Sequence, residues 1–198
     1  MANDPQKIRF APNGAIYVAL LNSGSTITPP AGLGDPDKAP AGYKALGYVD
    51  EGGVTLTPAI ETQPVNAWQS ATPVLYHVTS ASFSIKATLQ ETSKITTELF
   101  WGASWVEIMS EDPTPVGTGV YRLDLSSNPD IKEVSLVVDW NQGAIRNRAV
   151  INRSMISDRG AIQLSRTENG KYELTFEALD ASGKLGYVLT NDDIADTP

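Results

Sequence analysis

The sequence of 198 residues contains no cysteine and a single histidine, His77. The absence of cysteine excludes disulfides, thiolate metal sites and a cysteine nucleophile. One imidazole is too few for most zinc, haem or nucleophile–histidine sites, which need several ligands or a complete triad. We therefore predict no catalytic residues, no metal ligands and no cofactor.

Long apolar runs and an excess of basic charge are also missing. The longest uninterrupted apolar run, Ala15–Leu21, is far shorter than the roughly 18 residues of a membrane helix. The first residues show no apolar stretch of a secretory signal, so we expect a protein made and kept in a soluble compartment, without a membrane partner. A formal net charge of −8 argues against tight binding of nucleic acid, because proteins neutralise phosphates with basic grooves.

The short motifs of common enzyme classes are absent as well. There is no nucleophile elbow, phosphate-binding loop, zinc-protease motif or dinucleotide fingerprint. Glu173 and Glu177 share a predicted strand face, but nothing singles out one pair of acids as the two carboxylates of a glycosidase. We predict that the protein is not an enzyme.

The residues that are present predict a folded, mainly β protein. Hydrophobic residues make up 41% of the chain, and its length fits a single domain over residues 1–198. Three stretches alternate apolar and polar residues, as strands with one buried face do: Ala81–Leu89, Glu133–Trp140 and Lys171–Ala178. Shorter runs add strand candidates, among them Val54–Thr57, Leu75–Thr79 and Ala161–Ser165.

One segment, about residues 92–101, predicts a helix. Ile95, Leu99 and Phe100 fall on one side of it, a Thr or Ser stands at its N-cap, and Gly102 follows as a stop signal. One helix beside about ten strands gives a β-sandwich or barrel of antiparallel strands, with the helix closing one edge or face.

Residues 22–42 differ in composition from the rest of the chain. Four prolines and four glycines in 21 residues are incompatible with a strand pair or a helix. Such a long loop is usually functional, and Ile27 and Leu33 give it apolar side chains with which to dock. We predict a loop that orders on a partner, with a mobile surface insertion as the alternative, and a short flexible tail at residues 191–198.

The four tryptophans leave a carbohydrate-binding β-sandwich open as a minor alternative. Trp140 continues an apolar strand face and Trp101 ends the predicted helix, so we interpret both as core residues. Trp68 and Trp105 are not assigned to the core. The carbohydrate hypothesis predicts that one of them lies exposed on a sheet face of a monomeric protein.

Basic charge is concentrated in residues 144–166, which hold five basic residues and one acidic residue. A basic patch on an acidic body offers complementary surfaces for head-to-tail association of identical copies. Arginines that are merely solvated on a strand would give the same pattern. The composition leaves both interpretations open.

Three stretches taken in order carry a resemblance to a known family: Ala45–Pro58, with its leucine–glycine–tyrosine and acidic–glycine turn, Val65–Ser70, with its tryptophan–glutamine pair, and Thr92–Gly102. Over about residues 10–180, the chain resembles the major tail tube proteins of long-tailed, non-contractile bacteriophages of the siphovirus type. No catalytic residues belong to that family. Another β-rich tail or secretion-tube component, such as a terminator or a contractile-system tube, remains the alternative.

The resemblance implies a structural virion protein. Members are β-sandwich-like subunits with one helix that form rings, usually hexameric, which stack into a tail tube, and the sheets of neighbouring subunits merge. The implied partners are copies of the chain itself, tape measure and tail terminator proteins, and double-stranded DNA that passes without tight binding. The implied location is the virion tail, assembled in the host cytoplasm.

The resemblance also suggests roles for individual residues. Residues 22–42 occupy the position of a loop that reaches the neighbouring ring, with Ile27, Leu33, Asp35 and Asp37 as its candidates. An acidic lumen would repel phosphates, and the acidic candidates for lining it are Glu133, Asp139, Glu173 and Glu177. A neutral polar face with Ser82, Ser84 and Thr88 is the alternative lining. Four arginines are candidates for a subunit contact with acids of a neighbour: Arg146, Arg148, Arg153 and Arg159.

Overall fold

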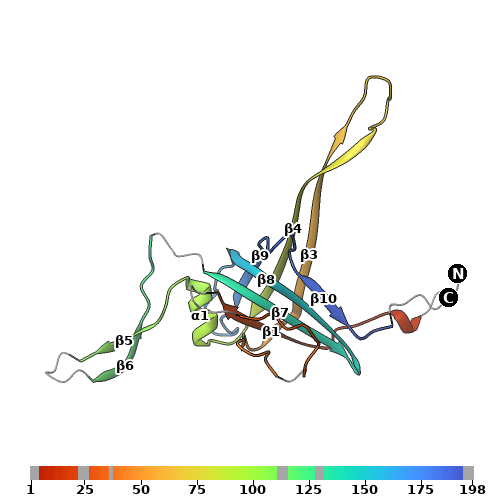
Figure 1. The fold of residues 1–198 in the computed structure, drawn as a ribbon. Helices are drawn as coiled ribbons and strands as arrows, with labels where there is room; N and C mark the ends of the chain where they lie inside the picture. Colours follow the sequence, from red (N-terminus) through yellow and green to blue (C-terminus); the bar gives the residue numbers. More distant parts are fainter. Residues whose placement is uncertain (1–4, 22–26, 36–37, 111–115, 128–131, 194–198) are drawn as a thin grey trace.

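The computed structural model describes residues 5–21, 27–35, 38–110, 116–127 and 132–193 (Figure 1). It consists mainly of antiparallel strands with one α-helix, so the predicted fold class is confirmed. The elements in chain order are η1 (Pro5–Lys7), β1 (Asn13–Leu20), β2 (Lys44–Ala45), β3 (Val49–Val65), β4 (Leu75–Leu89), α1 (Lys94–Trp101), β5 (Val106–Met109), β6 (Gly117–Arg122), β7 (Glu133–Gln142), β8 (Ile145–Arg159), β9 (Tyr172–Ala178) and β10 (Tyr187–Thr190).

Eight of the strands form one sheet, in the order β2-β1-β7-β8-β9-β4-β3 with β10 also paired to β8. The long strand β8 changes partner along its length. Its first part pairs with β10, through Asn147–Val150, and its last part pairs with β9, through Ser154–Arg159. A register shift relative to β7 interrupts β8 between these parts, a second one lies between Ile156 and Asp158, and such bulges bend a strand. Strands β5 and β6 form a separate two-stranded sheet.

The main core lies on one face of this sheet. It is built by the alternation seen in the sequence, since β9 buries every second residue from Tyr172 to Ala178. The largest fully buried side chains of this core are Ile16, Val18, Leu46, Ile85, Leu89, Val134, Leu136, Ile151, Leu174 and Phe176. Residues from β1 and β4, which are separated by three strands in the sheet, thus belong to one cluster.

The two ends of the sheet approach each other at residues 46–48. The N–H of Leu46 donates to the carbonyl of Ile16 in β1 (3.0 Å), and the N–H of Gln90, just after β4, donates to the carbonyl of Tyr48 (2.9 Å). Three consecutive residues therefore connect the first strands of the sheet to the last ones. The sheet is curled around its core and closed at this end like a barrel.

Helix α1 follows β4 and begins and ends at the predicted caps. The hydroxyl of Ser93 accepts from the N–H of Thr96 (3.2 Å). Gly102 has a φ of +70°, and its N–H donates to the carbonyl of Glu98 (3.0 Å), as expected of a left-handed C-terminal glycine. The hydroxyl of Thr96 donates to the carbonyl of Leu46 (3.3 Å), which fixes the helix against the closed end of the sheet.

Three sequence predictions differ from the structure. The runs Leu75–Thr79 and Ala81–Leu89 are one continuous strand, β4. Residues 161–165 form no strand, because the chain leaves the ladder after the N–H of Gly160 bonds to the carbonyl of Glu173 (3.0 Å). Trp101 is 41% exposed and is not a core residue, whereas Trp140 does pack against the core.

The described residues contain no helix that is both long and apolar enough to cross a membrane.

Candidate functional site

The second face of the sheet is covered over β1, β7 and the first part of β8. The described residues 27–35 and 38–43 lie on it and enclose a second apolar cluster of Tyr17, Ala19, Tyr43, Val137 and Val150, against which Ile27 and Tyr187 of the sheet strand β10 pack. The loop predicted to order on a partner is thus ordered, in its described residues, on the sheet of its own chain.

An ion pair is buried beneath this cover. The guanidinium of Arg148 donates to both carboxylate oxygens of Asp139, at 2.6 Å each, and their side chains are only 3% and 11% exposed. Asp139 raises the pKa of Arg148. A third N–H of Arg148 donates to the carbonyl of Gly32 (2.8 Å), so the pair holds the covering segment onto the sheet.

Further hydrogen bonds fasten the same segment. Arg146 donates to the carbonyl of Gly34 (2.6 Å), and the hydroxyl of Tyr187 donates to the carbonyl of Pro30 (3.0 Å). Gly34 has a φ of +62°, and a Cβ there would lie 3.1 Å from Nη1 of Arg148. A side chain at this position would meet both backbone strain and the buried ion pair.

The predicted inter-ring residues occupy different places in this segment. Ile27 packs into the second cluster, and Leu33 lines a groove described below. Asp35 forms an ion pair with Lys38 (3.0 Å), while Asp37 lies outside the described residues. Contact of these residues with a neighbouring ring stays a prediction.

The rest of the same sheet face is polar and accessible. We call it the open face; it consists of Thr55 and Thr57 of β3, Ser84, Lys86 and Thr88 of β4, and Glu173, Thr175 and Glu177 of β9, which are cross-strand neighbours. Glu173 forms an ion pair with Lys86 (3.0 Å). Two carboxylates therefore stand against one ammonium, which leaves the open face acidic.

Three of the four predicted acidic residues border or belong to the open face. Glu133 and Glu177 both pair in register with Met155, which places them two strands apart, about 10 Å. Arg153 donates to both oxygens of Glu133, at 2.8 and 3.1 Å, and lowers the pKa of that carboxyl. Asp139 differs from these three because it is buried in its ion pair.

The four arginines predicted at a subunit contact all bind acceptors of their own chain. Arg146 and Arg148 hold the covering segment, and Arg153 also donates to the carbonyl of Asp180 (3.0 Å). The Nε–H of Arg159 donates to the carbonyl of Leu99 (3.4 Å) near the end of α1, and burial lowers the pKa of Arg159. A role for these arginines between subunits stays a prediction.

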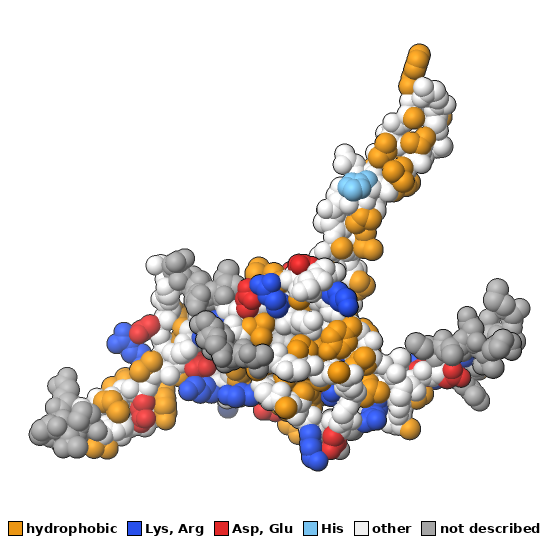
Figure 2. Space-filling view, in the orientation of Figure 1, with side chains coloured by type: hydrophobic (Ala, Val, Ile, Leu, Met, Phe, Trp, Pro, Cys, Tyr) orange, Lys and Arg blue, Asp and Glu red, His pale blue; other side chains and the backbone are white. Residues whose placement is uncertain are grey.

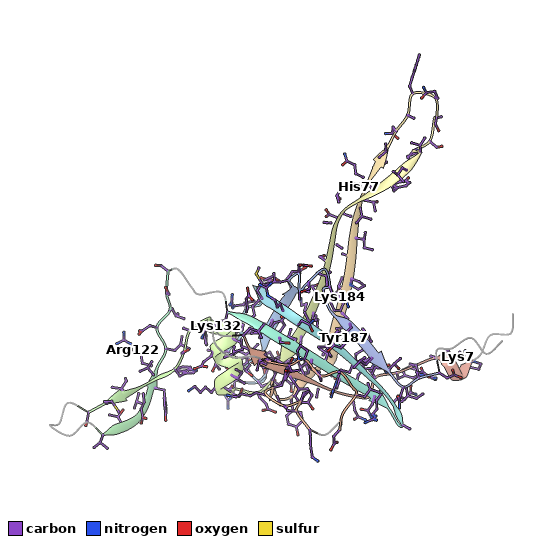
Figure 3. The ribbon with its side chains drawn as sticks, viewed as in Figure 1. Lys7, His77, Arg122, Lys132, Lys184 and Tyr187 are labelled. Atoms are coloured by element: carbon purple, nitrogen blue, oxygen red, sulfur yellow. The ribbon has the colours of Figure 1, made fainter. Side chains whose placement is uncertain are left out.

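The most prominent feature of the molecule is the outer part of the β3–β4 hairpin, residues 58–82, which we call the long arm (Figure 1). Glu61 is the only one of its 25 residues with a formal charge, and His77 is its only imidazole. Figure 2 shows apolar side chains along the arm, and Figure 3 places His77 on it. Seven large apolar side chains of the arm are 42–99% exposed: Ile60, Val65, Trp68, Val74, Leu75, Tyr76 and Val78.

Sequence reasoning missed the long arm, although a signal was available. Pro58 and Pro64 interrupt β3, and proline cannot donate to a strand ladder, so both prolines argued against a strand. In the structure they pair with Phe83 and Tyr76 at the edge of the sheet, because β3 is the last strand of its order. A charge-poor stretch rich in apolar residues was the available sign.

A second hairpin, β5–β6, projects from the other side of the body (Figure 1). It also exposes apolar side chains, including Val106 (65%), Val120 (56%) and Tyr121 (57%). The carboxylate of Glu107 accepts from the N–H of Gly119 (3.0 Å) and ties the two strands together.

A groove of about 910 Å³ opens beside β1 and β2. Its lining includes Asn13, Ala15, Leu33, Ala45, Tyr48 and Trp140. Strand β2 pairs only with Tyr17 and Val18 of β1, so residues 13–15 at the start of β1 border the groove without a β2 partner. The groove thus combines aromatic side chains, uncharged amides and backbone with three charged residues, Glu91, Asp139 and Arg146.

The remaining tryptophans do not form a sugar-stacking surface together. Trp68 lies in the turn of the long arm, outside any strand, and is 99% exposed. The indole N–H of Trp105 donates to the hydroxyl of Thr97 (2.8 Å), so this ring is fixed at the helix. The carbohydrate-binding alternative requires one of these tryptophans on a sheet face, and neither lies there.

The predicted flexible tail begins with two bonded residues. Asn191 accepts from the N–H of Arg146 (2.6 Å), and Asp192 forms an ion pair with Arg9 (2.7 Å). Residues 194–198 lie outside the described residues.

A known protein family matches the chain along its whole length. The sequence model of a family described as "Phage tail tube protein" matches residues 1–198. No curated protein sequence matches the chain. A chain of a solved structure titled "Virion of native gene transfer agent (GTA) particle" is similar at a TM-score of 0.39 and 11% identity, over 70% of this chain and 85% of that chain.

Proposed function

Because the chain belongs to the phage tail tube protein family, we propose that its copies assemble into stacked rings that form the wall of the tube. The family makes the protein a structural component of the virion tail rather than a catalyst. The proposed ring has six copies, and the proposed assembly takes place in the host cytoplasm, around a tape measure protein and up to a tail terminator.

The long arm is the observation that carries self-assembly. Monomeric proteins rarely expose an apolar surface of this extent unless a partner covers it, and the arm makes no contact with the body beyond its base. A second copy is the partner that a self-assembling family supplies. The arm and the body surface that receives it are different surfaces, so the contact is head-to-tail and builds an open-ended stack.

Ring closure is proposed to use the edge of β3. Among the described residues, β3 pairs with β4 alone, and residues 49–57 contain no proline. This part of the edge can accept a strand from a neighbouring copy, which would merge the sheets of the ring into a barrel without open edges.

The open face is proposed to line the lumen. It continues the edge of β3, so merging of the sheets would extend it around the ring. Glu173, Glu177 and the bordering Glu133 give it acidic character, which repels phosphates and lets double-stranded DNA pass without being bound. Asp139 does not contribute, because it is buried.

Negative-stain microscopy of the concentrated, purified protein tests the assembly. We expect rings or tubes roughly 100 Å across, from six domains of about 35–40 Å around a hole. The matched control replaces residues 59–81 by an Asn-Gly turn, which favours a tight hairpin. This variant should keep a β-type circular dichroism spectrum and form no tubes, because it retains the β3 edge proposed for the ring but lacks the arm proposed to join rings. A wild-type chain that stays monomeric at every concentration, or tubes from the armless variant, would contradict the proposal.

The lumen assignment has a separate test. Tubes of the Glu173→Lys/Glu177→Lys variant should retain double-stranded DNA in a co-sedimentation assay, whereas wild-type tubes should not. The control variant Asp124→Lys/Asp193→Lys changes the net charge equally at exposed positions outside both the open face and the β3 edge. Equal DNA retention by both variants would show that only net charge matters and would remove the lumen assignment.

A further inference from the structure

The tip of the long arm and the groove beside β1 and β2 fit each other in chemistry and placement. We infer that Trp68 of one copy docks in this groove of a copy in the next ring. The inference rests on the proposed function and specifies which two surfaces meet.

The tip is an ordered turn that presents its indole to solvent. The N–H of Val74 donates to the carbonyl of Val65 (2.9 Å) and closes the turn. Inside it, the hydroxyl of Ser70 donates to the carbonyl of Thr72 (2.8 Å). Trp68 is 99% exposed, and residues 66–74 carry no formal charge. An ordered turn loses little conformational entropy when it docks.

The groove offers a matching environment. Tyr48 is 76% exposed and forms an aromatic wall together with Trp140. The charged groups of the lining are already bonded inside the subunit: Glu91 accepts from the N–H of Tyr48 (2.9 Å), and Arg146 donates to the carbonyl of Gly34 (2.6 Å). The third charged residue of the lining, Asp139, is held by Arg148 (2.6 Å). Each charged side chain of the lining therefore already has a hydrogen-bond partner inside the subunit when an uncharged tip inserts.

The size of the groove and the chemistry of tryptophan agree. A volume of about 910 Å³ lies in the range of pockets that enclose compact ligands, about 300–1,000 Å³. A tryptophan buries about 150–250 Å² and is among the residues that most often dominate binding between proteins. Asn13, Asn141 and Asn147 of the lining can form hydrogen bonds with the backbone of the inserted turn.

The long arm and the groove lie on different sides of the subunit, so the docking contact must join two different copies. In Figure 1 the long arm rises from the top of the body, whereas the described part of the segment between β1 and β2, which contributes Leu33 to the groove, runs along the bottom. The arm therefore points away from its own groove. At about 3.4 Å per residue, the strand from Pro58 to Val65 spans roughly 25 Å, which reaches the facing side of an adjacent body.

Cysteine crosslinking tests the contact directly, because the natural chain has no cysteine. Ala67→Cys beside Trp68 and Ala45→Cys in the groove should form disulfides between copies in oxidised tubes and give a ladder of multimers on a denaturing gel. A second pair, Gln69→Cys with Asn147→Cys, samples a different geometry, since disulfides need Cβ atoms about 3.5–4.5 Å apart. The control pair, Ala59→Cys at the base of the arm with Ala45→Cys, should give no ladder.

The outcomes separate the docking contact from the proposed function. Tubes in which neither tip pair crosslinks, or in which the control pair crosslinks equally, would overturn the docking contact while leaving tube formation intact. If the wild-type chain forms no tubes, the proposed function itself fails.

Truncation of the indole gives an independent measure. Trp68→Ala should raise the protein concentration needed for tube formation at least tenfold, the effect of losing a residue that dominates an interface, while the thermal unfolding midpoint of the monomer stays unchanged. Leu164→Ala is the matched control, because Leu164 is 86% exposed but lies away from the arm. Tube formation by Trp68→Ala at the wild-type concentration would overturn the inference.

Discussion

The two halves of strand β4 form the same ladder with β3, but one half is partly buried in the body and the other is exposed in the long arm. From Phe83 to Leu89, side chains alternate between the core and the open face, whereas from Leu75 to Ala81 every side chain is exposed. The pairing with β3 runs through both halves, with register shifts between Val49 and Val54 and between Glu61 and Thr62. Backbone pairing is thus shared, and only burial distinguishes body from arm.

This difference teaches where the stability of the subunit resides. An isolated two-stranded hairpin is marginally stable in water, because its backbone hydrogen bonds contribute little net free energy without apolar burial. The body buries its apolar side chains within one chain. The arm leaves comparable side chains exposed, and in the proposed assembly another copy covers them, so side-chain substitutions should affect unfolding in one half and assembly in the other.

The largest expected difference concerns apolar truncations. Phe176 is fully buried. Phe176→Ala should lower the free energy of unfolding by about 3–5 kcal/mol, because it removes apolar burial and leaves a cavity. Val78→Ala, at a residue 53% exposed in the arm, should change it by less than about 0.5 kcal/mol. Urea denaturation of dilute, monomeric protein measures both. A loss of 2 kcal/mol for Val78→Ala would mean that the arm packs on something in the monomer.

The next largest loss of folding stability is expected on removal of the carboxylate from the buried ion pair. Asp139→Ala leaves Arg148 buried without its carboxylate and should destabilise the monomer by about 3 kcal/mol. Glu133→Ala removes the acid of an accessible pair, with side chains 40–45% exposed, and should cost much less because water screens that pair. Equal urea midpoints for the two variants would contradict the buried assignment of the Asp139 pair.

The covering segment should respond more mildly to a backbone change. Gly34→Ala forces a left-handed φ on alanine and brings a Cβ close to Arg148, at a cost of about 1–2 kcal/mol. Gly52→Ala is the control, since a Cβ there meets no atom within 4 Å. Thermal unfolding should show a lower midpoint for Gly34→Ala alone; an unchanged midpoint would indicate that residues 27–35 leave the sheet readily.

The smallest expected effect is the loss of folding stability when the pH is lowered. Arg153 lowers the pKa of Glu133 below its ordinary 4.5, and Lys171 lowers that of Asp50 below 3.8. The unfolded chain therefore binds more protons, so this stabilisation is complete above about pH 4.5 and is lost as the pH falls through the folded-state values. Urea midpoints between pH 6 and 3 should fall, and less steeply in Glu133→Gln. A midpoint independent of pH would contradict these shifts.

Much of the body could be predicted from the sequence. Period-two alternation located β9, most of β7 and the inner half of β4, because each has one face on the core and one on a polar surface. The helix caps at Ser93 and Gly102 were readable because capping is local chemistry. Curling of the sheet was not predictable, since it depends on the contacts of residues 46–48 with strands distant in sequence.

The arm and the ion pair were harder for physical reasons. The arm buries neither face in the monomer, so it shows no alternation, and its prolines mimic strand breakers. Asp139 and Arg148 look like surface charges in the sequence, because only the path of residues 27–35 over the sheet buries them. The sequence predicted a loop that orders on a partner, whereas the described part of the loop is held by Arg148 and Tyr187 of its own chain.

The prolines of β3 carry one more consequence. Pro58 and Pro64 remove hydrogen-bond donors from the outer edge of the long arm, where an unpaired strand would otherwise template fibrous aggregation. The arm can therefore expose apolar side chains without pairing with strands of other chains along its edge. In the proposed assembly, newly made chains would thus stay apart from one another until the growing end of a tube takes them up.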